Sequence, residues 1–328
     1  MARLSVIGAG AWGTVVAQLL AGNGHEVRLW ARDPDLVRQL QRTRLNSRRL
    51  PGVTLHPGIS FTADPEEAAE GSEAAFSAVP SAHLRNVLEN FPRFPLLISC
   101  TKGFSDDPLG TMTGVLREVQ PGAVTAALSG PNLASEIAAG KPAAAVVAAE
   151  AAEAAARIQG WLQGPDFRVY TSDDVIGVEV GGALKNVIAL ATGMSDQLEL
   201  GDNTKATLIT RGLHELLRLG TRLGGKRETF YGLSGLGDMI ATCAGPQSRN
   251  FLAGSRIASG VTHRQLQEEG LTAEGIGTVA RVYNYARTHG LELPISEAVH
   301  QVVFAQQPPS EAIRSLMERS SKPETAVY

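Results

Sequence analysis

The stretch from Val6 to Gly13, VIGAGAWG, decides how the first half of this chain folds. Its glycines, Gly8, Gly10 and Gly13, have the G-x-G-x-x-G spacing, follow an apolar strand-like run and open a helical pattern. The first glycine permits a tight turn, the second lets backbone approach a pyrophosphate, and the third lets helix and strand pack closely. Because N–H groups at a helix start bind phosphate oxygens, the stretch predicts a dinucleotide-binding βαβ unit rather than a plain glycine-rich turn.

Short apolar strands alternate with helical patterns up to about Asp173. In this region Asp33 precedes Pro34 and Asp64 precedes Pro65, the pattern of a helix N-cap followed by proline at the first helical position. The alternation predicts a Rossmann-like, doubly wound parallel sheet over residues 1–175. The predicted strands are 3–8, 25–32, 74–79, 95–100, 124–129, 143–149 and 167–171.

Beyond Asp173 only helical patterns follow, which predicts a helical domain over residues 176–328. Thr262 and Gln265 form a capping box at the start of one of these helices. The predicted fold class is therefore α/β followed by all-α. The helical segments are 174–194, 204–223, 237–243, 248–258, 262–270, 278–290, 295–304 and 309–320.

Composition excludes several classes of protein. The chain has 328 residues, 19% charged residues and a net charge of -3, which gives no support to nucleic-acid binding. Two cysteines cannot build a disulfide framework, so we expect a reducing compartment and a cytoplasmic location. No secretory signal is visible, the Ala-rich run 143–156 is too short and too charged to span a bilayer, and no metal-ligand spacing occurs.

The end of the second predicted strand, Trp30-Ala31-Arg32-Asp33, bears on the choice of cofactor. Arg32 lies about twenty residues past the glycine loop, where a cation favours a ribose 2′-phosphate and an acid favours a 2′-hydroxyl. We interpret Asp33 as the cap of the next helix, so NADP is the expected cofactor, with NAD as the alternative. Arg32 as an ordinary exposed arginine stays open.

Lys185 and Asn186 stand inside the apolar run VEVGGALKNVIALATGM, residues 178–194. A lone lysine in such a run can snorkel, with its stem on apolar surface and its charge in water. A desolvated lysine instead has a lowered pKa and can exchange a proton near neutral pH. The run by itself leaves both interpretations open.

Polar residues follow two of the predicted strands, where ligands of open α/β sheets bind. Lys102 follows one strand, and Gly130 and Asn132 follow another. A loop lysine and a Ser-Gly-Pro turn are also common parts of a scaffold, so a structural role remains an alternative for each.

The helical half holds two further candidate groups. Asp238 and Thr242 are four residues apart and share a helix face. Ser248, Arg249 and Asn250 stand at a predicted helix start, where the guanidinium fork suits a phosphate dianion. By itself, Ser-Arg-Asn is more often a helix cap with an exposed arginine.

Taken in order, the motifs GAGAWGT, TKG, SGPNLASE, GVEVGGALKNVIALATG, GDNTKATLITRGL, GLSGLGDMIATC, SRN, EG, LPISEAV and LMERSSKPE resemble one family. It is the NAD(P)-dependent glycerol-3-phosphate dehydrogenases, most closely the bacterial type. The resemblance implies reversible reduction of dihydroxyacetone phosphate to sn-glycerol 3-phosphate. It also implies a homodimer and a role in glycerophospholipid precursor synthesis.

The resemblance carries residue roles with it. Lys185 matches the catalytic proton donor and acceptor, Asp238 matches the aspartate that positions it, and Lys102 matches a further active-site lysine. The matching cofactor positions are Gly8, Gly10, Ala11, Trp12, Gly13, Arg32, Lys102, Ala134, Arg249 and Glu274. The matching substrate positions are Lys102, Gly130, Asn132, Lys185, Asn186, Asp238, Thr242, Ser248, Arg249 and Asn250.

Three other interpretations of the sequence compete with this one. A β-hydroxyacid-type dehydrogenase prefers Lys-x-x-x-Asn, whereas here asparagine follows Lys185 directly and Ala189 takes the later position. GTRLGGK at 220–226 matches a P-loop, but Arg227 follows in place of Ser or Thr. A non-catalytic cofactor sensor would be expected to lack the lysine.

Overall fold

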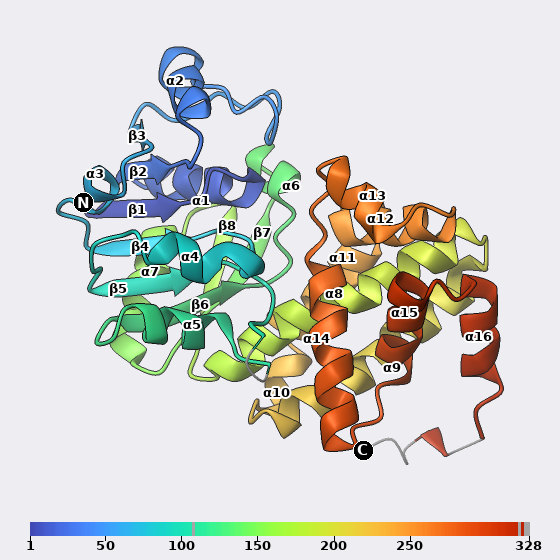
Figure 1. The fold of residues 1–328 in the computed structure, drawn as a ribbon. Helices are drawn as coiled ribbons and strands as arrows, with labels where there is room; N and C mark the ends of the chain where they lie inside the picture. The colour runs from blue at the N-terminus through green and yellow to red at the C-terminus, as the bar shows by residue number, and fades with distance from the viewer. Residues whose placement is uncertain (107–108, 321–322, 325–328) are drawn as a thin grey trace. The chain divides into compact units, whose positions relative to one another are not determined.

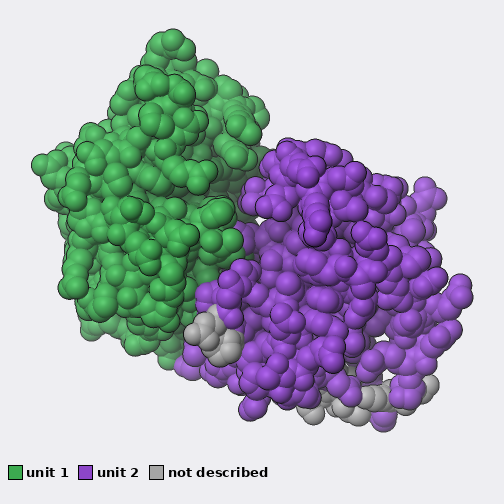
Figure 2. All heavy atoms as spheres, in the orientation of Figure 1, with its two compact units in different colours: residues 1–102, 111–175 green, residues 103–110, 176–328 purple. Residues whose placement is uncertain are grey.

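The computed structural model describes residues 1–106, 109–320 and 323–324. The chain divides into two compact units, coloured separately in Figure 2. Unit 1 comprises Met1–Lys102 and Thr111–Val175, and unit 2 comprises Gly103–Gly110 and Ile176–Tyr328. The sequence suggested a single junction after residue 175, whereas the structure also groups the short segment Gly103–Gly110 with the helical unit.

Unit 1 is built on an eight-stranded sheet with the order β3-β2-β1-β4-β5-β6-β7-β8 (Figure 1). Neighbouring strands are parallel except β6 and β7, which are antiparallel. The predicted doubly wound sheet is confirmed, with this antiparallel pair as an addition to it. The strands are β1 (Arg3–Ile7), β2 (Glu26–Trp30), β3 (Ile59–Thr62), β4 (Ala74–Ser77), β5 (Leu96–Ser99), β6 (Val124–Ser129), β7 (Ala143–Ala149) and β8 (Phe167–Ser172).

Helices cover both faces of this sheet because successive strand residues point to opposite sides. Phe76 of β4 packs in the core shared with α1 and α7, whereas its neighbour Ala75 packs in the core shared with α3, α4 and α5. The predicted caps are confirmed, since Asp33 and Asp64 each accept a hydrogen bond at the start of a helix. The helical elements are α1 (Ala11–Gly22), α2 (Pro34–Thr43), α3 (Pro65–Ala69), η1 (Ser81–His83), α4 (Leu84–Leu88), α5 (Met112–Val119), α6 (Ala134–Ala138) and α7 (Ala152–Leu162).

Unit 2 is helical and packs around the long helix α8 (Val175–Gln197). This helix is long and apolar enough to cross a membrane, but 94% of its most apolar window is buried inside the fold, as in a core helix. The predicted capping box at Thr262 and Gln265 is confirmed. The other elements are α9 (Gly201–Arg222), α10 (Arg227–Phe230), the π-helical turn η2 (Leu233–Gly237), α11 (Asp238–Cys243), α12 (Arg249–Ala258), α13 (His263–Glu268), α14 (Glu274–His289), α15 (Pro294–Ala305) and α16 (Pro309–Met317).

Glycines bring neighbouring backbones against α8. A Cβ at Gly275 would lie 2.6 Å from the Asn186 carbonyl oxygen, and one at Gly254 would lie 2.1 Å from that of Leu190. Such distances leave no room for a side chain, so α12 and α14 approach α8 at backbone contact. The polar side chains of α8 are consequently held between closely packed helices.

Candidate functional site

The glycine-rich loop joins β1 to α1 beside the carboxyl end of β4. Gly8 has φ +110°, a backbone conformation that favours glycine, and a Cβ there would lie 3.0 Å from the Ala78 carbonyl oxygen. A Cβ at Gly13 would lie 1.9 Å from the Gly8 carbonyl oxygen, whereas one at Gly10 would meet nothing within 4 Å. The loop therefore has a tight turn, a close helix–strand contact and an open central position, as a pyrophosphate requires.

This loop lies where the strand order reverses, between β1 and β4. In doubly wound sheets the crevice at that point binds the dinucleotide. The N-terminus of α1 has no side-chain cap, which leaves its first N–H groups for a ligand. The residues present fit a dinucleotide.

Buried polar atoms near the same edge also lack partners. Trp12 Nε1 and both amide atoms of Asn132 are buried with no hydrogen-bond partner within the described part of the chain. Buried polar groups are nearly always paired, so orphaned atoms of this kind indicate a place for a ligand. Asn132 follows β6, and in the same region Lys102 Nζ donates to the Gly130 carbonyl oxygen at 2.7 Å.

The end of β2 bears on cofactor choice. Asp33 Oδ1 accepts from the Asp35 backbone N–H at 2.9 Å and so caps α2, as predicted. Arg32 is exposed beside it. The helix start therefore engages one oxygen of the acid, and both side chains are exposed.

In unit 2, Lys185 is buried with hydrogen-bond partners, so the snorkelling interpretation is wrong. Only 6% of the residue is exposed, and Nζ donates to Asp238 Oδ1 at 2.7 Å and to Thr242 Oγ1 at 2.5 Å. Thr242 Oγ1 also donates to Asp238 Oδ1 at 3.2 Å, which confirms that these two residues share a helix face. The contact between Lys185 Nζ and Asp238 Oδ1 is a buried ion pair.

A π-helical turn explains why Asp238 meets Lys185. The sequence LSGLG forms η2 immediately before α11, and such turns are frequent at functional sites. A Cβ at Gly181, one helical turn before Lys185, would lie 2.7 Å from the Ser234 carbonyl oxygen in η2. The glycine at 181 therefore lets η2 rest on α8, and α11 begins at Asp238 with its carboxylate against the lysine.

Asn186, the residue after Lys185, belongs to a network of hydrogen-bonded amides, called here the amide chain. Asn250 Nδ2 donates to Asn186 Oδ1 at 2.7 Å, and Asn250 Oδ1 accepts from the Gly275 N–H at 2.9 Å. Asn186 Nδ2 in turn donates to the Gly182 carbonyl oxygen at 3.4 Å. The chain links α8, α12 and the start of α14, where Glu274 is the first residue.

The three residues of the Ser-Arg-Asn motif lie in three different environments. Ser248 Oγ accepts from the Phe251 N–H at 3.3 Å and caps α12, so the cap reading holds for this serine. Arg249 is the first residue of α12 and is exposed, and Asn250 is buried in the amide chain. Among the substrate candidates, unit 2 thus brings together Lys185, Asn186, Asp238, Thr242 and Asn250.

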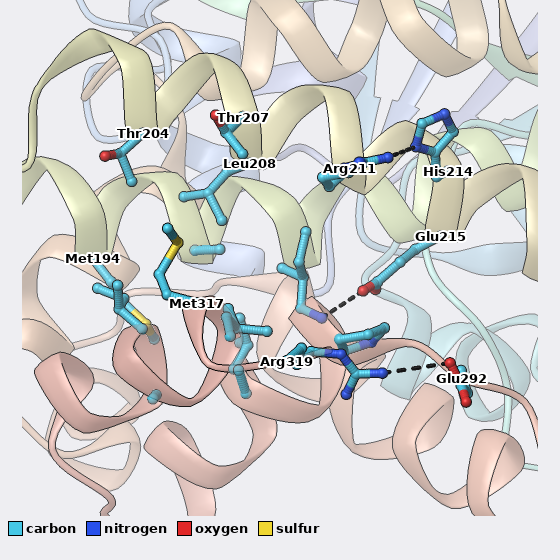
Figure 3. A pocket seen from close by; sticks show the side chains of 18 of the residues that line it. Met194, Thr204, Thr207, Leu208, Arg211, His214, Glu215, Glu292, Met317 and Arg319 are labelled. Carbon is cyan, nitrogen blue, oxygen red and sulfur yellow. Dashed lines mark hydrogen bonds and ion pairs between the residues drawn. The ribbon is translucent and has the colours of Figure 1, made fainter. Parts of the chain in front are cut away.

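Metal-ligating side chains and the Cys243 thiol bear on what else the described residues could do. In the described ranges, no three His, Cys, Asp or Glu side chains are placed to hold a metal ion. Burial raises the pKa of Cys243 to about 11, which keeps it a neutral thiol. A separate cavity of about 370 Å³ in unit 2 is lined by residues of α8, α9, α15 and α16 and of the segments next to them (Figure 3), and its lining contains none of the site candidates.

The fold and these groups define a nicotinamide dinucleotide-dependent dehydrogenase. Sequence models described as NAD-dependent glycerol-3-phosphate dehydrogenase N-terminus and C-terminus match residues 3–155 and 174–314. The chain belongs to the glycerol-3-phosphate dehydrogenase family and is an oxidoreductase, as the resemblance implied.

Individual relatives agree over nearly the whole chain. Glycerol-3-phosphate dehydrogenase [NAD(P)+] of Thermus thermophilus is 47% identical over 98% of this chain and 100% of its own length. That of Geobacter sp. (strain M21) is 44% identical over 98% of both. The crystal structure of glycerol-3-phosphate dehydrogenase from Coxiella burnetii has a TM-score of 0.92 at 36% identity, covering 97% of this chain and 99% of its own. The β-hydroxyacid alternative is not favoured.

Proposed function

We propose that this protein catalyses reversible hydride transfer between NAD(P)H and C2 of dihydroxyacetone phosphate, giving sn-glycerol 3-phosphate. The observation that carries the proposal is the buried Lys185–Asp238–Thr242 group on α8 and α11, in a chain of this family. A dehydrogenase acting on a ketone needs a proton donor of this kind.

The mechanism assigns proton movement to Lys185. When bound, the reduced nicotinamide supplies a hydride to the carbonyl carbon. Negative charge then develops on the C2 oxygen, and Lys185 Nζ donates a proton to it. In the oxidative direction neutral Lys185 accepts the hydroxyl proton. Asp238 and Thr242 fix the direction of the Nζ group through the hydrogen bonds described above, so little reorganisation is needed during the reaction.

Phosphate recognition is assigned to Arg249. Its guanidinium stands exposed at the start of α12, and a planar fork binds two phosphate oxygens at once. Binding energy from the phosphate, remote from C2, orients the reacting carbon. Further proposed substrate contacts are Lys102, Gly130, Asn132, Asn186, Thr242, Ser248 and Asn250.

Cofactor binding is assigned to the domain 1–175, and the proton chemistry to the domain 176–328. The glycine loop would hold the pyrophosphate, and the orphaned Trp12 Nε1 would find its partner in the ligand. Further proposed contacts are Ala11, Lys102, Ala134, Arg249 and Glu274. NADP is the proposed preferred cofactor because Arg32 is exposed while Asp33 caps α2.

The test is the loss of reduced-nicotinamide absorbance with dihydroxyacetone phosphate, run in parallel with NADPH and NADH. Rapid loss is expected with NADPH, and slower loss with NADH. The ratio of kcat/KM for the two cofactors decides the preference, and a ratio favouring NADH would reject the role given to Arg32. No loss with either cofactor, from folded protein that binds them, would reject the substrate.

Assembly and cellular role are further parts of the proposal, and they rest on the resemblance to the family. We propose a cytoplasmic homodimer that supplies the glycerol backbone of phospholipids. Sedimentation equilibrium would reject the dimer if it returned the monomer mass of 34.6 kDa at all concentrations. Fractionation of source cells tests the location. Cells lacking the protein should lose phospholipid synthesis and regain it when glycerol 3-phosphate is supplied, and unchanged synthesis without the supplement would reject the role.

A further inference from the structure

Asn46 is a fully buried polar residue that contacts the glycine-rich loop. It lies in the segment after α2 and has 0% exposure. Its side-chain Nδ2 donates to the Ala9 carbonyl oxygen at 3.0 Å and to Thr14 Oγ1 at 2.9 Å. Ala9 lies between the first two glycines of the motif, and Thr14 lies in the first turn of α1.

The orientation of this amide is determined by its partners. A carbonyl oxygen can only accept, so the group that faces Ala9 must be the NH₂. Thr14 Oγ1 already donates to the Gly10 carbonyl oxygen at 2.8 Å, so it accepts from Asn46. Both amide hydrogens are thereby used on the loop.

The segment that carries Asn46 is itself firmly held. The Asn46 carbonyl oxygen accepts from the Leu50 N–H at 2.8 Å, and Leu50 is buried in the main core of unit 1. The Arg44 guanidinium donates to the Leu55 and Ile59 carbonyl oxygens at 3.0 and 2.8 Å. Asn46 therefore reaches the loop from a fixed backbone.

The effect on the loop follows from peptide geometry. In a planar trans peptide the C=O and N–H groups point in opposite directions. Asn46 holds the Ala9 carbonyl, so the N–H of Gly10 points away from Asn46. Gly10 is also the loop position at which a Cβ would meet no atom. One amide thus fixes the peptide plane and, through Thr14, the start of α1.

Asn46 also has an unfavourable feature that a role in stability alone does not explain. Its Oδ1 is buried without a hydrogen-bond partner in the described part of the chain. Leaving a buried acceptor unpaired is unfavourable, so the gain must lie in what the NH₂ group does.

We propose that Asn46 is a positioning residue for the cofactor, which presents the Gly10 N–H to the dinucleotide pyrophosphate by holding the Ala9–Gly10 peptide. The inference rests on dinucleotide binding by the glycine loop, part of the proposed function. It does not depend on the identity of the substrate.

The experiment measures the Kd for NADPH by fluorescence, without substrate, in wild type, Asn46→Ala and Asn46→Asp. Asn46→Ala should raise the Kd about tenfold, the effect of losing roughly 1.4 kcal/mol of preorganisation. Asn46→Asp should raise it further, because an oxygen would then face the Ala9 carbonyl. The KM for NADPH should rise with the Kd, while kcat and the KM for dihydroxyacetone phosphate should change less than about twofold.

Gln120→Ala is the matched control. Gln120 is also a buried amide of unit 1, and it donates to the Pro92 carbonyl at 3.0 Å and accepts from the Phe94 N–H at 2.9 Å. It should lower Tm and leave the Kd unchanged. Thr14→Val should weaken NADPH binding, and Thr14→Ser, which keeps the hydroxyl, should restore it.

Failure of this inference and failure of the proposed function give different results. If Asn46→Ala lowers Tm as Gln120→Ala does but keeps the wild-type Kd, Asn46 is structural only and the inference is overturned. If Asn46→Ala does not fold, Thr14→Val and Thr14→Ser provide the same test, and a wild-type Kd in Thr14→Val overturns the inference. A wild type that binds NADPH but does not reduce dihydroxyacetone phosphate rejects the proposed substrate and leaves the Kd comparison valid, whereas a wild type that binds no NADPH rejects both.

Discussion

At the scale of single residues, Lys185 shows how an apolar helix accommodates an ammonium. A buried charge is tolerated when it is paired and hydrogen-bonded, and Asp238 and Thr242 meet both conditions. The sequence alone left snorkelling open because the partners lie more than fifty positions away. Only the fold brings them together, through η2 and the glycine at 181.

Replacing Lys185 by methionine tests its role. The methionine keeps an unbranched apolar stem but donates no proton, so kcat should fall by at least ~10²–10⁴. The Kd for NADPH should remain near that of the wild type. Removing the lysine also leaves Asp238 buried without its cation, so folding must be checked by circular dichroism. Lys141→Met, at an exposed lysine paired with Glu136, is the control, and turnover near wild type in Lys185→Met would reject the mechanism.

At the scale of elements, local signals predicted most of the fold. The strands, the Asp33 and Asp64 caps and the capping box are encoded by neighbouring residues, so they are readable from the sequence. β3 is missing from the prediction because only two of its four residues, Ile59 and Phe61, are apolar, which gives a weaker pattern than the equally short β4 and β5. The antiparallel pairing of β6 and β7 depends on chain direction, which periodicity does not contain.

The parts of the site that escaped prediction depend on long-range contacts. Asn46 was not predicted because its partners are in the glycine loop, and an isolated asparagine in a loop has no pattern. The same holds for the cap of α15. Leu293 provides no side-chain cap there, and the Glu215 carboxylate from α9 accepts from the Ile295 N–H instead (Figure 3).

Glu215 predicts a pH dependence of stability. Its carboxylate accepts from the Ile295 N–H, from the Ser296 N–H at 3.1 Å and from Ser296 Oγ at 2.7 Å. Burial nevertheless outweighs these bonds and raises its pKa from 4.5 to about 7. The folded state therefore binds more protons than the unfolded state between these values, and the stability from the protonated form is lost as pH rises toward 7.

The loss should amount to about 3 kcal/mol, at ~1.4 kcal/mol per pKa unit. Urea unfolding of wild type and Glu215→Gln from pH 5 to 8 measures it, since the glutamine does not titrate. As pH rises, the free energy of unfolding of the wild type should fall relative to that of Glu215→Gln. The hydrogen bond from Ser296 favours the ionised form of Glu215. In Ser296→Ala the pH-dependent loss of stability should therefore extend to higher pH. A pH-independent difference would contradict the assignment.

At the scale of the whole molecule, one segment packs with a different unit from the one that flanks it in the sequence. The segment Gly103–Gly110 follows β5 of unit 1 but belongs to unit 2. Phe104 is fully buried in the same core as α8, and Leu109 packs there as well. Unit 2 therefore completes its core with side chains from the middle of the other unit's sequence, and the fragment 176–328 lacks part of its own interior.

Phe104→Ala should consequently loosen unit 2 and not unit 1. Truncating a buried phenylalanine costs about 3–5 kcal/mol, and the loss falls on the unit whose core it fills. Hydrogen–deuterium exchange should accelerate in α8 and α14, while β1 and β4 keep their protection. Phe76→Ala is the matched control, because Phe76 is equally buried in the sheet core of unit 1 and should give the opposite pattern. Faster exchange in β1 and β4 after Phe104→Ala would show that the segment stabilises the sheet instead, since exchange reports where the lost contacts were made.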